Sequence, residues 1–221
     1  MSANKDQQAQ PKRRSKGERT RESILNAAII VLAQNGIKGT THRAVAQQAQ
    51  LQLSLTTYYF KDIQELIQQA FILNSNAIMA TAMTAWQQTF DALSEISLDQ
   101  SVNAETRLEI ATQLTSMARA YIDNKLRHEP TSLAVEQLLF TEVHRAPELA
   151  DLADKHWLAL REPFVRMCQH LAPADAETHA EIMLTLFTQI EYRHLAVAVD
   201  DIDWLPIEAM IKKVMSWLLN I

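Results

Sequence analysis

Apolar residues recur along most of this chain at intervals of three and four positions, which is the spacing of one face of an α-helix. In the first such segment Ile24, Ala27, Ala28 and Val31 share a face, and Gly36 follows it as a typical helix C-terminus. This pattern, with prolines and capping residues as boundaries, predicts nine helices, at residues 16–35, 42–48, 53–59, 62–93, 104–126, 131–145, 147–171, 175–199 and 206–220. The chain is therefore predicted to be all-α.

Two helix starts carry specific capping signals. Thr40 and Thr41 precede the second helix and offer a hydroxyl that can accept a backbone N–H from its first turn. Asp62 and Glu65 have the spacing of a capping box at the start of the long fourth helix, with aspartate in the place of serine or threonine.

Glycine usage supports the all-α prediction and excludes several function classes. The chain of 221 residues has three glycines, all within the first 39 positions, whereas average usage of about 7% would give about fifteen. A glycine-rich phosphate loop, a dinucleotide fingerprint or a turn-rich β-sandwich needs more glycine than this. No motif for a nucleophile, a cofactor or a metal appears either, so we expect a protein that is not an enzyme and binds no cofactor.

Compartment signals are consistent with the cytoplasm. The single cysteine, Cys168, cannot form an internal disulfide and is expected to be a buried apolar filler. No apolar run approaches the roughly 20 residues that span a bilayer, and no apolar segment follows the basic N-terminus as in a secretory signal. We therefore expect a cytoplasmic protein with no membrane partner.

The net charge of −5 conceals an uneven distribution. Residues 1–61 contain ten Lys and Arg against three Asp and Glu, a formal charge of +7, whereas the remaining residues contain eleven against twenty-three, a charge of −12. Such asymmetry indicates a polyanion partner for the N-terminal part, or else a solvated basic tail without a partner.

The first three predicted helices have the lengths and order of a helix-turn-helix unit. The third, at residues 53–59, combines hydroxyl and aromatic side chains, and Lys61 follows it. No acidic residue lies between Gly36 and Lys61, so this segment could approach phosphates without repulsion between like charges.

At this point the chain resembles the TetR family of transcriptional regulators. The resemblance extends from Ile24 to Leu66 and rests on Ile24, Leu25, Ala27, Ala28, Gly36, Thr40, Thr41, Val45, Ala46, Ala49, Thr57, Tyr58, Tyr59 and Phe60. Three positions depart from the family pattern. Gln50 replaces a glycine in the turn, where a positive φ is expected, Ser54 replaces a smaller residue, and Ile63 replaces a lysine whose phosphate contact Lys61 could take over.

The resemblance implies a domain organisation and a DNA-binding surface. Residues 1–15 would be a disordered basic arm, 16–61 a DNA-binding domain with its helix-turn-helix at about 41–60, and 62–221 a helical ligand-binding and dimerisation domain. The arm would follow a neighbouring groove or serve only as a solubility tail. The implied DNA-binding residues are Thr41, Arg43, Ser54, Leu55, Thr57, Tyr58, Tyr59 and Lys61, with Arg43 alternatively a solvated helix residue.

The resemblance also implies a homodimer and a small-molecule effector. The expected interface comprises Ile182, Leu186 and Gln189 on the eighth helix and Ile207, Ile211, Val214 and Leu218 on the ninth, unless these stripes close the core of the protomer. The expected ligand pocket involves Met79, Met83, Trp86, Phe90, Tyr121, Phe140, Trp157 and Tyr192, with His128, Glu136, His144 and His156 as polar candidates. Each of these has an alternative role as an ordinary core or surface residue.

The function predicted from these features is that of a homodimeric, sequence-specific DNA-binding repressor that a ligand releases from its operator. One alternative is a di-metal enzyme of ferritin-like type, suggested by Glu191 and His194, but a second Glu-x-x-His motif is missing. Another is a helical adaptor without a DNA role, which would leave the +7 segment and the tyrosine-rich third helix unexplained.

Overall fold

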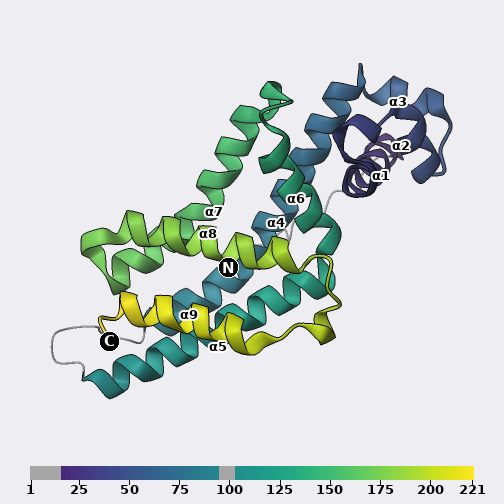
Figure 1. Ribbon diagram of the computed structural model, residues 1–221. Coiled ribbons are helices and arrows are strands. Elements are labelled where there is room, and N and C mark those ends of the chain that lie inside the picture. The colour runs from purple at the N-terminus through teal and green to yellow at the C-terminus, as the bar shows by residue number, and fades with distance from the viewer. Residues whose placement is uncertain (1–15, 95–102) are drawn as a thin grey trace, which may run out of the picture.

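Nine α-helices and three short 3-10 turns make up the residues that the computed structural model describes, 16–94 and 103–221 (Figure 1). The predicted basic arm, 1–15, lies outside the described residues. The helices are α1 (Lys16–Gly39), α2 (His42–Gln48), α3 (Leu53–Tyr59), α4 (Ile63–Ser94), α5 (Ala104–His128), α6 (Pro130–Glu142), α7 (Ala150–Leu171), α8 (Ala176–His194) and α9 (Trp204–Leu218). All nine correspond to predicted helices, which confirms the all-α fold. None of the described helices combines the length and the apolar character needed to cross a membrane.

The predicted start and stop signals act as expected in the first half of the chain. Gly36 interrupts the helical conformation of α1 with φ 66° and ψ −177°. Thr41 caps α2 by accepting the N–H of Ala44 at 3.1 Å, and Asp62 accepts the N–H of Glu65 at 2.8 Å at the start of α4. The Glu65 carboxylate reaches back to a backbone N–H, as in a capping box, although the donor is Lys61.

The largest error in the predicted boundaries concerns the end of α8, which stops at His194 although the apolar pattern predicted helix to residue 199. The next residues form a turn, with the N–H of Val197 donating to the carbonyl of His194 at 3.0 Å, and a 3-10 turn at Val199–Asp201. Asp200 and Asp201 would have stood at the negative end of a longer helix, where acidic side chains are unfavourable.

Gln50 lies between α2 and α3 in the left-handed conformation, with φ 55°. This is the positive φ that the sequence pattern predicted for this position. That conformation costs a residue with a Cβ roughly 1–2 kcal/mol. We therefore expect Gln50→Gly to raise the free energy of unfolding by about 0.5–1 kcal/mol, because the relieved strain exceeds the extra entropy of glycine in the unfolded chain. Urea denaturation would measure the change. The same substitution at Gln52, where φ is −69°, should give no gain.

Buried side chains form two cores, and α4 contributes to both. The N-terminal core joins α1 and the first turns of α4 to α6 and the start of α7, and contains Ile24, Leu32, Phe60, Leu66, Phe71, Val135, Leu139 and Leu149. The C-terminal core joins the rest of α4 to α5, α7, α8 and α9, and contains Ile78, Ile122, Phe164, Met183, Phe187 and Ile211. Figure 1 shows α1–α3 grouped at one end of the molecule, with α4 running from this unit into the remaining helices.

Candidate functional site

Most residues predicted to contact DNA lie together on the exposed side of α2 and α3. Their side chains form what is called here the α2–α3 surface: Thr41, Arg43, Ser54, Thr57, Tyr58 and Lys61 are exposed, and Leu55 and Tyr59 are half-buried. Tyr58 has 79% of its surface exposed. Its ring makes an edge contact with Tyr59, with centroids 5.1 Å apart.

The opposite side of the same helices fixes this surface on the protein. Val45, Thr56 and Phe60 are almost fully buried, and the Thr56 hydroxyl donates to the carbonyl of Leu53 at 2.8 Å. The guanidinium of Arg21 lies over the Phe60 ring, 5.0 Å from its centroid, and donates to the Gln69 side chain at 3.3 Å. Arg21, which the sequence analysis did not select, thus ties α1 to the end of α3 and to α4.

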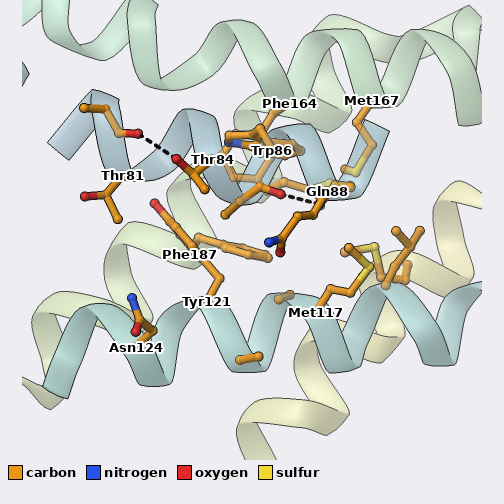
Figure 2. Close-up of a pocket in the computed structure, with 18 residues that line it drawn as sticks. Thr81, Thr84, Trp86, Gln88, Met117, Tyr121, Asn124, Phe164, Met167 and Phe187 are labelled. Carbon is orange, nitrogen blue, oxygen red and sulfur yellow. Dashed lines mark hydrogen bonds between the residues drawn. The ribbon is translucent and has the colours of Figure 1, made fainter. Parts of the chain in front are cut away.

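A cavity of about 720 Å³ opens between α4 and α5 and extends toward α7, α8 and α9 (Figure 2). Polar side chains from α4 and α5 include Thr81, Thr84, Gln88, Thr89, Tyr121 and Asn124. The apolar walls include Trp86, Leu114, Met117, Phe164, Met167, Met183, Phe187 and Met215. A volume of this size lies within the range of about 300–1,000 Å³ that is usual for small-molecule pockets.

Of the residues predicted for the pocket, Trp86 and Tyr121 line this cavity. Met83 and His144 are instead exposed, as is His128. Phe90 stacks on the outer side of Trp86, with ring centroids 5.6 Å apart. Phe140, Trp157 and Tyr192 lie near α6 instead. The Phe140 ring packs on His156 and Trp157, and the Tyr192 hydroxyl donates a hydrogen bond to the Glu136 carboxylate.

Most residues that line the cavity were not predicted from the sequence, because the predicted pocket residues were mainly aromatic. A usable signal was present on α4, where Thr81, Thr84 and Gln88 stand at positions i, i+3 and i+7 of one helix face. On α5, Met117, Tyr121 and Asn124 stand at positions i, i+4 and i+7, which also share one helix face. The side chains supplied by α7, α8 and α9 come together only in the folded protein.

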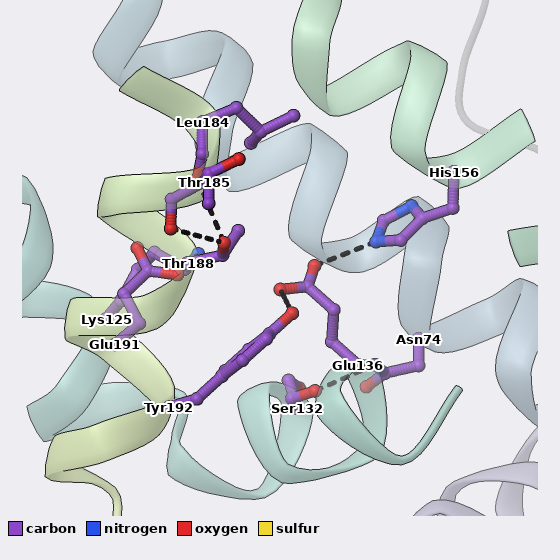
Figure 3. A network of polar contacts seen from close by, with 10 residues as sticks. All are labelled: Asn74, Lys125, Ser132, Glu136, His156, Leu184, Thr185, Thr188, Glu191 and Tyr192. Carbon is purple, nitrogen blue, oxygen red and sulfur yellow. Dashed lines mark hydrogen bonds and ion pairs between the residues drawn. The ribbon is translucent and has the colours of Figure 1, made fainter. Parts of the chain in front are cut away.

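A network of buried charged and polar groups lies behind the inner wall of the cavity (Figure 3). The Lys125 ammonium pairs with the Glu191 carboxylate at 2.7 Å, and both side chains are 3% exposed. Glu136 accepts a bond from the Tyr192 hydroxyl at 2.9 Å and lies 2.8 Å from His156 Nε2. A space of about 20 Å³ is bordered by these charged groups and by Trp86 and Tyr121 of the cavity.

The ionisation of the network follows from its contacts. Burial alone lowers the pKa of Lys125, but the carboxylates of Glu191 and Glu136 together raise it above its ordinary value. Burial disfavours the charged form of Glu136, yet the hydrogen bonds from His156 and Tyr192 and the charge of Lys125 lower its pKa. Burial raises the pKa of Tyr121, so this phenol stays neutral. The single cysteine is inert for the same reason, because burial raises the pKa of Cys168 to about 12.

The residues predicted for a subunit interface divide between surface and core. On α8, Ile182 and Gln189 are exposed and Leu186 is half-buried. On α9, however, Ile207, Ile211 and Leu218 are at most 2% exposed and belong to the C-terminal core, and Val214 is half-buried. The stripe on α9 therefore closes the core of the protomer, which was the alternative for these residues. The outer face of α9 carries Leu205, Met210 and Trp217 instead, with 77%, 42% and 58% exposed.

The pair that suggested a di-metal enzyme has other partners. Glu191 is held by Lys125, and His194 Nδ1 lies 2.6 Å from the carbonyl of Ile190. Among the described residues, no group of three or more His, Cys, Asp and Glu side chains is arranged to hold a metal ion.

Comparison with known proteins bears on the fold. No family model matches this sequence, and no curated protein matches it. Among solved structures, a putative TetR-family transcriptional regulator from Mesorhizobium loti has a TM-score of 0.64 and 13% identity, covering 94% of this chain and 98% of its own. A TetR-family member from Streptomyces coelicolor has a TM-score of 0.60 and 22% identity, covering 91% and 99%. The multidrug binding protein EbrR, solved in complex with proflavin, has a TM-score of 0.53 and 21% identity, covering 90% and 99%.

These alignments cover 90–94% of the chain, although sequence identity is low. The chain thus has the fold of the TetR-family transcriptional regulators.

Proposed function

We propose that this protein is a homodimeric, sequence-specific DNA-binding transcriptional regulator, which acts in the cytoplasm as a repressor and leaves its operator when a small molecule binds. The observation that carries the proposal is the composition of the α2–α3 surface. It exposes hydroxyls, an aromatic ring and the cations Arg43 and Lys61 on one side, with no acidic residue between positions 36 and 61. In helix-turn-helix proteins the second helix of the motif enters the major groove, a place that α3 would take here.

The individual side chains suit this docking. Arg43 can form a bidentate contact with a guanine edge or bind a phosphate. Ser54, Thr57 and Tyr58 would reach base edges, whereas Leu55 would contact a thymine methyl group. Thr41, Tyr59 and Lys61 would position the protein on the phosphate backbone. The acidic remainder of the chain would be repelled by the same phosphates, which favours docking through the α2–α3 surface.

The test begins with selection of bound sequences from random double-stranded DNA. Against the selected operator, Arg43→Ala and Tyr58→Ala are each expected to weaken binding about tenfold to a hundredfold, because each removes a contact in the groove. Fluorescence anisotropy at fixed salt would measure the affinities, and circular dichroism would show that helicity is unchanged.

Lys155→Ala is the matched control, since Lys155 is an exposed cation on α7 that pairs with Asp151. Its operator affinity should stay near that of the wild type. If Arg43→Ala and Tyr58→Ala both bind the operator as the wild type does, the assigned DNA surface is wrong. A protein that binds all sequences equally, and loses all binding as salt rises, would be a charge-only binder rather than a regulator.

The outward faces of α8 and α9 support the homodimer part of the proposal. Ile182 on α8 and Met210 and Trp217 on α9 expose apolar surface on helices that contact each other within the protomer. A two-fold symmetric pairing through these helices would cover both faces at once. It would also hold two α3 helices at a fixed separation, as successive major grooves require.

The path from ligand to DNA would run through α4. This helix begins directly after α3, contributes to the N-terminal core and lines the cavity further along its length. A ligand that fits the cavity better in one position of α4 than in another would shift the population of DNA-binding dimers. The effect is limited to the difference in its affinity for the two states.

A further inference from the structure

We propose that the cavity between α4 and α5 is selective for uncharged, largely aromatic molecules, and that it disfavours both organic anions and organic cations. The proposal rests on the proposed function, in which this cavity receives the effector, and it adds the chemical class of that effector. It follows from the charges that the cavity lacks and from the way in which the neighbouring charges are already paired.

Among the described residues, 16–94 and 103–221, the lining of the cavity contains no ionisable acid or base apart from the phenol of Tyr121. None of its residues is an aspartate, glutamate, lysine, arginine or histidine. Burial raises the pKa of Tyr121, so that group is neutral as well. A carboxylate or phosphate that left water for this cavity would lose its hydration without meeting a counter-charge, which opposes its binding strongly.

The charges nearest to the cavity are already engaged with each other. Glu191, the acid that a cationic ligand would need, is paired with Lys125 at 2.7 Å. Both carboxylate oxygens of Glu136 have partners, one being His156 and the other Tyr192. A cation could therefore recruit either acid only by displacing a buried partner.

Aromatic walls can attract cations without any acid, but one of them is already in contact with a positive charge. The Lys125 ammonium lies 5.2 Å from the centroid of the Tyr121 ring. This ammonium lies over the Tyr121 ring and is itself paired with Glu191, so a ligand cation could not take the same position on that ring.

The remaining features favour flat apolar molecules. Trp86, Phe164 and Phe187 form a chain of edge-to-face contacts with centroids 4.7 and 5.4 Å apart, a geometry that aromatic groups extend favourably. Met117, Met167, Met183 and Met215 add flexible side chains that adapt to irregular shapes.

The polar groups of the cavity lie toward its mouth. Thr84, Gln88 and Asn124 are exposed, whereas most of the apolar lining is buried. Figure 2 shows Gln88 from α4 and Tyr121 from α5 extending into the space between these helices. A bound molecule would place its rings inward and any hydroxyl, carbonyl or amine group near this polar mouth.

The test compares two probes that share one framework with a third that is a planar cation. N-phenyl-1-naphthylamine is neutral, 1-anilinonaphthalene-8-sulfonate is the same molecule with a sulfonate, and proflavin is a planar cation. Fluorescence titration of the full-length protein at pH 7 should show the neutral probe binding at least about tenfold more tightly than either charged probe. Equal or tighter binding of the sulfonate or of proflavin overturns the proposal, as does a neutral probe that does not bind.

A charge placed in the wall provides a second test. Met117→Glu should weaken binding of the neutral probe and tighten binding of proflavin, each by about tenfold, because it supplies the unpaired acid that the natural cavity lacks. Ser116→Glu is the matched control, since Ser116 is exposed on the same helix and does not line the cavity. An equal effect of both variants would show that the probes bind elsewhere and would refute the assignment.

DNA binding is measured separately, without any probe. Selective binding of the neutral probe by a protein that recognises no DNA sequence would reject the proposed function and leave the ligand class standing. Sequence-specific DNA binding without this probe selectivity would reject the ligand class alone.

Discussion

Glu191→Leu is expected to lower the free energy of unfolding by about 3–5 kcal/mol, because it leaves the buried Lys125 ammonium without its counter-charge. Both side chains are 3% exposed, so water cannot take the place of the lost carboxylate. Burial would then act on Lys125 with much less opposition, and its pKa would fall from its raised value. Urea denaturation at pH 7 would measure the loss as a shift of the midpoint at constant slope.

Two further variants make this prediction specific. In the double variant Lys125→Met with Glu191→Leu, no charge is left unpaired, and most of the stability should return. Asp151→Leu removes one partner of the exposed Lys155–Asp151 pair and should cost less than about 1 kcal/mol. If Glu191→Leu is as mild as Asp151→Leu, or if the double variant is no more stable than the single one, the buried pair does not have the role assigned to it.

The buried network lies on helices that also contribute to the N-terminal core and to the cavity. Its members come from α5, α6, α7 and α8, and on α6 Glu136 directly follows Val135, a residue of the N-terminal core. On α5, Lys125 lies one helical turn after Tyr121, which lines the cavity. The network therefore joins a helix of the N-terminal core, α6, through α8 to a helix that lines the cavity, α5.

Local signals in the sequence were sufficient to predict the three-helix unit. Thr41 and Gly36 act through their own backbone and the next few residues, so their roles do not depend on the rest of the fold. The positive φ at Gln50 was predicted instead from the resemblance to the family, in which a glycine stands at this position. The exposed side of α3 could also be predicted, because Tyr58 and Tyr59 cannot both be buried on so short a helix. The positions of these elements therefore follow from the sequence alone.

The lining of the cavity and the outer surface of α9 could not be predicted in the same way. Helix α9 carries two apolar stripes, one through Ile207 and Ile211 and another through Met210 and Trp217, and periodicity alone does not say which faces the core. Packing on α5 decides this. The Lys125–Glu191 pair joins residues 66 positions apart, and no local pattern indicates that the two charges meet.

Trp217→Glu is expected to convert the proposed dimer into a monomer, because two-fold symmetry places the same substitution on both sides of the interface. Two carboxylates would then face apolar surface, and the exposed indole would be lost from the outer face of α9. Sedimentation should show a mass of 25.1 kDa for the variant and twice that mass for the wild type at micromolar concentration.

The same variant should bind the selected operator about 10²–10⁴-fold more weakly, since a monomer loses the effective concentration that links its two half-sites. Its affinity for a single half-site should stay unchanged, because α2 and α3 lie at one end of the molecule, away from α9 (Figure 1). Leu158→Glu is the matched control: Leu158 is 60% exposed on α7, outside the proposed interface, and the variant should remain a dimer with normal operator affinity. A Trp217→Glu protein that still sediments as a dimer would place the interface elsewhere, and a wild-type monomer would refute the dimer itself.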